Sequence, residues 1–106
     1  MKKILKELIG LKDKKIILND IEYKVIRNDE DCFDQDVVQE RIKETDYFEK
    51  YDYIMGDYAY DKVRLKGYFD SKNKNVTKIN DIKTMDDYIE NYCQTGAKIF
   101  VLEKLK

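Results

Sequence analysis

The chain has 106 residues, which is enough for one domain with a hydrophobic core and leaves little room for a second. Hydrophobic residues make up 42% of it and charged residues 41%, a balance typical of a folded domain with a solvated surface rather than of a disordered chain. The 21 basic and 22 acidic residues leave a net charge of −1, which argues against attraction of nucleic acid by the whole molecule but allows a local basic patch.

The first fifteen residues are rich in lysine, and their apolar residues fall near helical spacing. The pattern is typical of a basic amphipathic helix that contacts membrane or nucleic acid, of an arm that docks on a partner, or of a first helix or tail that covers part of the domain. We favour the last interpretation, because the segment is short and Gly10 interrupts it. The chain is therefore divided into an arm over residues 1–15 and a domain over residues 16–106.

Ile16 to Arg27 predicts a first β-hairpin. Asn19 and Asp20 are expected at its turn, because both residue types tolerate the left-handed conformations that tight turns need. From residue 21 to residue 25 apolar side chains alternate with charged ones. One face of this strand is therefore predicted to be buried and the other to face solvent.

Residues 28–36 are acidic but do not match a calcium-binding loop. Counted from Asp29, the position that requires glycine in an EF-hand is Asp34, and Phe33 stands where a ligand belongs. The acids are predicted instead to cap a helix over about residues 34–44 and to favour its positive N-terminal end. Val38 and Ile42, one turn apart, give this helix a narrow apolar stripe, so we expect it to lie on the surface of a sheet.

The stretch from Tyr51 to Phe69 is the longest with strand-type alternation. It predicts a central hairpin with strands over residues 51–58 and 62–69, joined by Ala59, Tyr60 and Asp61. The face of the second strand that is expected in the core carries Val63, Leu65, Gly67 and Phe69. The other face carries a basic row that ends in an aromatic ring: Lys62, Arg64, Lys66 and Tyr68. We predict that this polar face is the working surface.

A second helix is predicted between Thr84, as its N-cap, and Gly96, as a left-handed residue after its last turn. Its apolar stripe is interpreted as core and consists of Met85, Tyr88, Ile89, Tyr92 and Cys93. The last strand, over residues 97–105, contains a run that is apolar on both faces, which indicates an interior strand covered on each side.

Together these elements predict an α+β fold in a single domain. We expect a mostly antiparallel sheet of about five strands with two helices packed on it. The elements follow one another in the order strand-strand-helix-strand-strand-helix-strand.

Several segments also match a known family. They are Tyr-Asp-Tyr-Ile-Met-Gly-Asp-Tyr at residues 51–58, Arg-Leu-Lys-Gly-Tyr-Phe at 64–69, Asp87-Tyr88, Tyr92-Cys93 and Phe100-Val101-Leu102. In these segments the chain resembles the YutD-like family of small proteins from Gram-positive bacteria, from about Ile16 to Leu105. Tyr58 stands where the family is expected to have tryptophan. The family has no established function, so the resemblance implies a compact cytosolic α+β domain and no catalytic residues.

Histidine is absent, which excludes Ser-His-Asp and Cys-His sites and any zinc site that uses imidazole. The two cysteines, Cys32 and Cys93, are too few for a structural zinc site. They could form one disulfide, but free thiols are expected in a lysine-rich chain without a signal peptide, with Cys93 an inert thiol in the core. No apolar run approaches membrane-spanning length, so we expect a cytoplasmic protein without a transmembrane segment, and we expect no cofactor and no metal.

The first functional hypothesis is binding of RNA or a ribonucleoprotein through the basic and aromatic face of the central hairpin. Cations would contact phosphates and rings would stack on unpaired bases. The candidate binding residues are Lys62, Arg64, Lys66, Tyr68, Tyr58 and Tyr60. The plainer interpretation is a solvated face with cross-strand ion pairs, such as Arg64 with Asp57 or Asp52.

The second hypothesis is a protein-interaction adaptor, because nine tyrosines supply many amphipathic contact groups. The third is an enzyme in which Asp52, Asp57, Asp61 and Asp70 converge and hold magnesium. The spacing of these acids matches no known motif, so we rank this hypothesis last. The sequence therefore favours a non-enzymatic module that binds a macromolecule.

Overall fold

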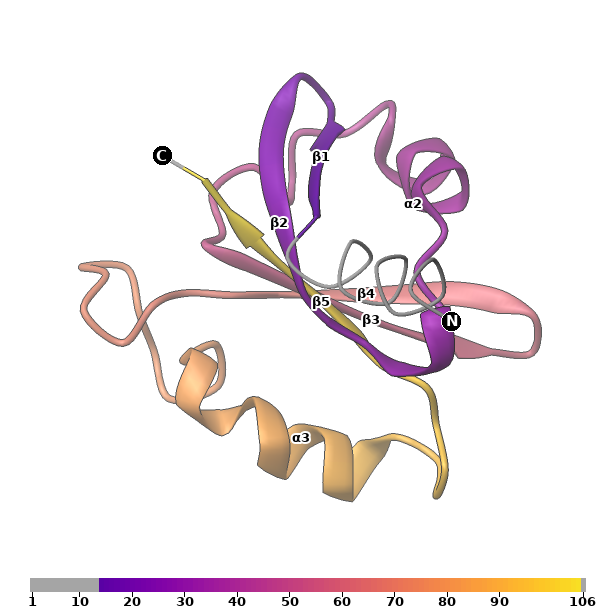
Figure 1. Ribbon diagram of the computed structural model, residues 1–106. Coiled ribbons are helices and arrows are strands. Elements are labelled where there is room, and N and C mark those ends of the chain that lie inside the picture. Colours follow the sequence, from indigo (N-terminus) through magenta and orange to yellow (C-terminus); the bar gives the residue numbers. More distant parts are fainter. Residues whose placement is uncertain (1–13, 106) are drawn as a thin grey trace, which may run out of the picture.

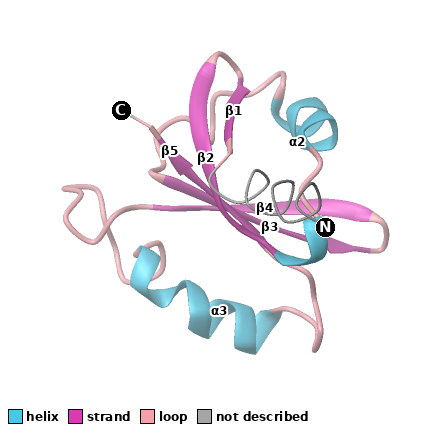
Figure 2. Cartoon of the chain, in the orientation of Figure 1, coloured by secondary structure: helices cyan, strands magenta, loops and turns pink. Residues whose placement is uncertain are grey.

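The computed structural model describes residues 14–105, which form a five-stranded antiparallel sheet with one helix packed against each face (Figures 1 and 2). The strands are β1 (Lys15–Leu18), β2 (Ile21–Asn28), β3 (Tyr53–Ala59), β4 (Lys62–Tyr68) and β5 (Phe100–Lys104). The helices are α2 (Gln35–Ile42) and α3 (Met85–Tyr92), with short 3-10 turns at Asp29–Asp31 and Ile82–Thr84. The predicted α+β fold and its order of elements are confirmed. Residues 1–13 of the predicted arm lie outside the part of the chain that the structure describes.

The strands lie side by side in the order β1-β2-β5-β3-β4, so β5 is central and β1 and β4 are the edges. β5 pairs antiparallel with β2 and with β3. Figure 1 shows this last strand, in yellow, crossing the middle of the sheet. Phe100, Val101 and Leu102 are buried, which confirms the interior strand predicted from the doubly apolar run.

Two-residue turns close both hairpins. Asn19 and Asp20 have φ values of 49° and 63°, which confirms the predicted first turn. Tyr60 and Asp61 have φ values of 52° and 62° and form the second turn. This connection is shorter than predicted, since Ala59 is still part of β3 and pairs with Lys62. Turns with positive φ at both central residues match the twist of the strands that they join.

α2 packs on the first face of the sheet. The Asp34 carboxylate accepts hydrogen bonds from the N–H groups of Asp36 and Val37 at 3.1 and 3.2 Å, and so caps the helix as predicted. Val38 and Ile42 are buried in the core of this face. The helix contacts β1 and β4, the two edge strands, so the twisted sheet curls around it (Figure 1).

α3 lies across the second face. Tyr88 and Ile89 pack against a buried cluster that includes Met55, Tyr68 and Val101. The end of β4 and the 3-10 turn before α3 are also joined, by a parallel bridge beyond the last residue of the strand. This helix therefore covers the face of β4 that the sequence predicts to be a free working surface.

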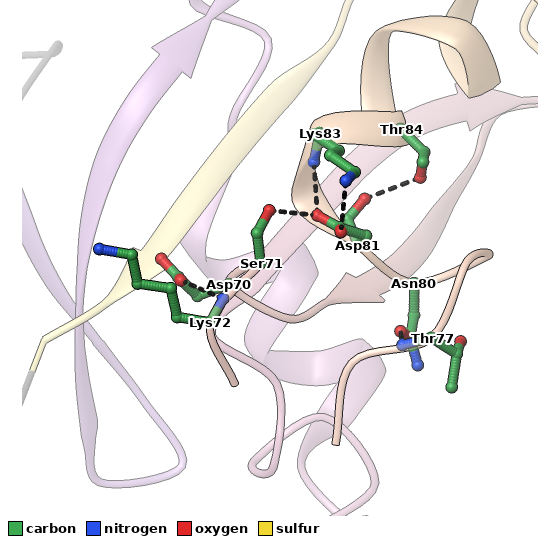
Figure 3. A network of polar contacts seen from close by, with 8 residues as sticks. All are labelled: Asp70, Ser71, Lys72, Thr77, Asn80, Asp81, Lys83 and Thr84. Atoms are coloured by element: carbon green, nitrogen blue, oxygen red, sulfur yellow. Dashed lines mark hydrogen bonds and ion pairs between the residues drawn. The ribbon is translucent and has the colours of Figure 1, made fainter. Parts of the chain in front are cut away.

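Thr84 stands at the N-cap position of α3, as predicted, but its side chain makes no capping hydrogen bond. Asp81 organises the start of the helix instead. The Asp81 carboxylate accepts from the Ser71 hydroxyl at 2.5 Å and from the Lys83 N–H at 3.1 Å (Figure 3). The helix ends before Gly96, whose φ of 80° belongs to the turn that leads toward β5.

Candidate functional site

The basic row on β4 is not an open surface along its whole length. Lys62 is exposed, but Tyr68 at the other end is fully buried in the cluster under α3. The alternation of the strand places Tyr68 on the predicted face, but α3 then packs over that face. Contrary to the prediction, Tyr68 has no ring surface for a partner.

Arg64 is held by a cross-strand ion pair, as the plainer interpretation of the sequence predicts. Its Nε donates to Asp57 Oδ1 at 2.9 Å and its Nη2 to Asp57 Oδ2 at 2.5 Å. Asp57 is only 2% exposed, whereas the Arg64 side chain is 48% exposed. The bonds to this carboxylate raise the pKa of Arg64 further above its ordinary value. The guanidinium therefore serves first to neutralise a buried acid.

Lys66 is directed toward the rings of the second face. Its Nζ lies 4.9 Å from the ring centre of Tyr68 and 5.2 Å from that of Tyr88. A cation at this distance from an aromatic face is attracted to it. Lys66 thus links β4 to α3 in addition to facing solvent in part.

The other two predicted tyrosines have different surroundings. Tyr58 is half-buried on the first face, where its hydroxyl donates to the carbonyl oxygen of Cys32 at 2.8 Å. Tyr60, at the tip of the β3–β4 turn, is 94% exposed. Of the three predicted tyrosines, only Tyr60 therefore presents its whole ring to solvent.

Tyr60 has a backbone conformation that does not suit its residue type. Its φ of 52° lies in the left-handed region, where bulky residues are uncommon. Asn19, at the same position of the first hairpin, is a residue that tolerates this region. Left-handed backbone at a bulky side chain is often found at functional positions. A tyrosine that is both strained and exposed therefore marks this turn as a candidate site.

Replacing the turn by the preferred pair, Tyr60→Asn with Asp61→Gly, is expected to raise the free energy of unfolding by about 1 kcal/mol. The gain arises because asparagine and glycine adopt positive φ more readily than the native pair. Urea denaturation of both proteins measures it. Asp20→Gly in the first hairpin is the matched control and should give a smaller gain, since Asn19 already suits its turn. A loss of stability in the double variant would contradict the assignment of strain.

A groove of about 650 Å³ separates α2 from the β3–β4 turn. We call it the α2–turn groove. Its lining residues are Val37, Glu40, Arg41, Ala59, Tyr60, Asp61, Lys62, Val63 and Arg64. The groove therefore brings three of the predicted site residues, Tyr60, Lys62 and Arg64, together with one side of α2.

The groove carries a small excess of positive charge. Within residues 14–105, Arg41 and Lys62 form no ion pair, whereas Glu40 is bonded to Lys43 at 2.7 Å. Asp61, which also lines the groove, offsets one of the two positive charges of Arg41 and Lys62. The arrangement suits a ligand that has apolar groups beside acidic ones.

A second hollow, of about 310 Å³, lies beside α3. We call it the α3 hollow. Its lining includes Lys66, Lys78, Ile79, Tyr88 and Tyr92. The two tyrosine rings stack with centres 5.1 Å apart and an angle of 27° between their planes. Tyr92 is 70% exposed, so the prediction that it belongs to a buried stripe is wrong.

Comparison with known proteins identifies the lineage. The family model described as "Putative antitoxin YutD-like" matches residues 17–103. The chain belongs to the YutD-like family. It is 37% identical over 91 residues to "Putative antitoxin YutD" of Bacillus subtilis (strain 168), a match that covers 86% of this chain and 98% of that one. The solution NMR structure of yutD from B. subtilis is similar with a TM-score of 0.68 at 36% identity, and covers 92% and 90% of the two chains.

The acids proposed for magnesium do not converge in this YutD-like chain. Asp57 is bound to Arg64, and Asp61 lies at the tip of the hairpin. Asp52 and Asp70 meet at the opposite end of the hairpin, where Asp52 accepts from the N–H of Asp70 at 2.8 Å. Within residues 14–105 no three acids or cysteines are grouped as they would need to be to hold a metal ion. No helix in this part of the chain is long and apolar enough to span a membrane.

Cys32 and Cys93 are free thiols, as predicted. Both are partly buried. Burial raises the pKa of Cys32 above its ordinary value. Burial, together with the nearby Asp57 carboxylate, raises the pKa of Cys93 to about 11. The thiolate is the reactive form, so this pKa makes Cys93 a poor nucleophile at neutral pH.

In the native protein, Cys93 is therefore expected to react with iodoacetamide roughly a hundredfold more slowly at neutral pH than in the protein unfolded in urea. The shift from 9.0 to about 11 lowers the thiolate fraction by this factor. The native rate should rise with pH until the pH passes the raised pKa. Site-resolved mass spectrometry measures the modification. Equal rates in the native and unfolded protein would contradict the shift.

Sequence reasoning missed the part that α2 plays in the groove. Val37 and Arg41 lie beside the predicted stripe of this helix, and nothing in the sequence places them next to the β3–β4 turn. It also missed Lys78 and the exposure of Tyr92 in the α3 hollow. One signal was present: Tyr60 is an unusual residue for a two-residue turn, and such a departure from turn chemistry often marks function.

Proposed function

We propose that this YutD-like chain is a protein-binding module that docks its partner in the α2–turn groove. The observation that carries the proposal is Tyr60, an exposed aromatic ring kept on strained backbone at the rim of the groove. Tyrosine is enriched among the residues that dominate protein interfaces. The name of the B. subtilis relative adds support, since an antitoxin counteracts a toxin and does so directly when it binds a protein toxin.

The contacts of the basic row favour a protein over nucleic acid as the partner. Arg64 neutralises Asp57, and Lys66 lies over two rings. Tyr68 is buried. The row thus has few free cations for phosphates, and affinity for nucleic acid depends mainly on such contacts. In the groove, by contrast, exposed Val37 and the ring of Tyr60 offer apolar contact area.

The experiment is affinity capture with the tagged full-length chain from a lysate of the organism of origin, with bound protein and bound nucleic acid both quantified. Three forms are compared: wild type, Tyr60→Asn and Val37→Glu. Tyr60→Asn keeps the fold and relieves the strained turn, so a loss of binding cannot come from unfolding. The captured protein is then purified and titrated against the same three forms.

We expect one discrete protein to bind the wild type directly, and each groove variant to weaken that binding about tenfold or more. Lys74→Glu, an exposed change in the loop after β4, is the control and should bind like wild type. Capture of nucleic acid alone, or a protein that binds all four forms equally, would refute docking in this groove.

Single-stranded nucleic acid is the second candidate, and the α3 hollow is the observation that favours it. Stacked tyrosines next to Lys66 and Lys78 match the combination of rings and cations that such proteins use. A fluorescent oligoribonucleotide tests it, with Tyr92→Ala and Lys78→Glu as variants. Both residues are exposed, so neither change should disturb the fold. Salt-sensitive binding that these variants abolish would support this candidate, and binding unaffected by them would exclude it.

A further inference from the structure

The outer edge of β4 presents a row of outward-facing peptide groups. Just beyond the strand, the Phe69 N–H donates to the Asn80 carbonyl at 2.7 Å, and the Phe69 carbonyl accepts from the Ile82 N–H at 2.9 Å. Both peptide groups of Phe69 therefore point away from β3. Since these groups alternate in direction along a strand, those of Gly67, Leu65 and Val63 point outward as well.

The outward groups of Val63 and Leu65 have no hydrogen-bond partner in residues 14–105, whereas Gly67, nearer the bridge, is buried. β4 pairs with β3 on its inner side and is the last strand of the sheet on its outer side. The bridge at Phe69 occupies only the position after the strand. At the other end, the α2–turn groove runs beside Lys62, Val63 and Arg64. The edge is thus bounded by a chain segment at one end and is open at the other, where the groove lies.

The charges of β4 indicate what could pair with this edge. Lysines on an edge strand oppose pairing with a similar strand. Arg64 is neutralised by Asp57, but two copies of β4 side by side would set Lys62 and Lys66 against the same two cations, which disfavours self-pairing. The chain's own residues 1–13 carry four lysines against Glu7 and Asp13, so they have the same sign as the edge. An acidic segment of another protein is the complementary occupant.

The two faces of β4 specify the pattern of that segment. Lys62 and Lys66 project from the second face, whereas Val63 and Leu65 project from the first. A strand added to this edge would carry acidic side chains next to the lysines. Its intervening side chains would be apolar and would extend the first core toward α2. Main-chain bonds would supply affinity and the side chains would supply specificity, as in other cases of strand addition.

We infer that the partner adds an extended segment, in which acidic and apolar residues alternate, as a new antiparallel strand on the outer edge of β4. The inference rests on the proposed function and names the chemical class of the partner's docking segment. In this arrangement the apolar residues of the segment exchange hydrogen bonds with Val63 and Leu65, because paired residues of antiparallel strands share a face.

A labelled peptide that alternates glutamate and valine over about nine residues tests the inference on the full-length wild-type chain. Binding is followed by fluorescence anisotropy. Two N-methylated versions are compared, one methylated on the valines and one on the glutamates. The valine N–H groups should face β4, so valine methylation is expected to weaken binding about tenfold or more, whereas glutamate methylation should leave it nearly unchanged. None of these changes alters the protein, so its folding plays no part.

Amide hydrogen exchange gives a second readout. Binding should slow exchange at Val63 and Leu65, and a peptide of the same composition with its glutamates and valines in two blocks should not. If only the glutamate-methylated peptide lost affinity, the added strand would be parallel to β4. That result would still support strand addition at this edge. Equal binding of both methylated versions, no binding of the alternating peptide, or protection only at α3 would overturn the inference.

The two proposals fail in different ways. If the captured protein still loses affinity for Tyr60→Asn while the peptide does not bind, the partner docks in the groove by another mode and only the strand addition is refuted. If the chain captures no protein that rebinds after purification, the proposed function itself is refuted.

Discussion

A Gly56→Ala variant is expected to lose about 3 kcal/mol of unfolding free energy, because the added methyl group has no room in the core. An alanine Cβ at this position would lie 2.0 Å from Cζ of Phe100. Phe100 is fully buried on central strand β5, with its ring 5.2 Å from that of Phe33 and 6.3 Å from that of Tyr58. The ring cannot move aside without displacing these neighbours, so the methyl group forces the strands apart.

Urea denaturation measures this loss. Gly96→Ala is the matched control, because nothing lies within 4 Å of its Cβ position and its φ of 80° is the one source of cost. That variant should lose only about 1–2 kcal/mol. Adding Phe100→Leu to Gly56→Ala should recover part of the loss, which would show that the two positions are coupled. A Gly56→Ala protein as stable as Gly96→Ala would show that the core adapts, contrary to the expected clash.

An Arg64→Met variant is expected to lose about 2–3 kcal/mol, because it leaves the buried Asp57 carboxylate without its partner. This loss of stability is expected to be smaller than for a fully buried ion pair, since water reaches the half-exposed guanidinium. The double variant Arg64→Met/Asp57→Leu should be more stable than Arg64→Met alone, because apolar side chains can replace a buried pair. Chemical denaturation of the single and double variants provides the measurement.

Lys62→Met serves as the control on the same strand. Its ammonium is exposed and forms no ion pair within residues 14–105, so the change should cost less than about 0.5 kcal/mol. If Arg64→Met were equally mild, the ion pair would contribute nothing to the stability of the fold.

The contrast between Arg64 and Lys62 also bears on function, since charge reversal at Arg64 would damage the fold before it reported on binding. Lys62 and Tyr60 are therefore the better probes of a partner.

The groove and the edge of β4 give the proposed function a physical basis. Tyr60 stands at one end of β4, and the open peptide groups of Val63 and Leu65 follow it along the strand. A docked segment could therefore contact the tyrosine ring and pair with the edge at once.

The sequence by itself determined the features that depend on neighbouring residues. Asn19 and Asp20 make their turn because their side chains tolerate positive φ, and Asp34 caps α2 because its carboxylate lies within reach of the next N–H groups. The doubly apolar run at residues 99–102 required a strand covered on both faces. The alternation of β4 likewise assigned each side chain to the correct face. These outcomes follow from local geometry, which a short stretch of sequence contains.

Only the tertiary structure decided what covers each face, and with it the site. Alternation places Lys66 and Tyr68 on the second face. The packing of α3 there buries Tyr68 and leaves Lys66 directed onto aromatic rings. The curl of the sheet brings Arg41 of α2 and Lys62 of β4 into the lining of one groove, although these residues belong to separate elements. Burial depends on contacts between segments distant in the chain. The pattern of one strand specifies its two faces, but it contains no information on which helix will pack against either of them.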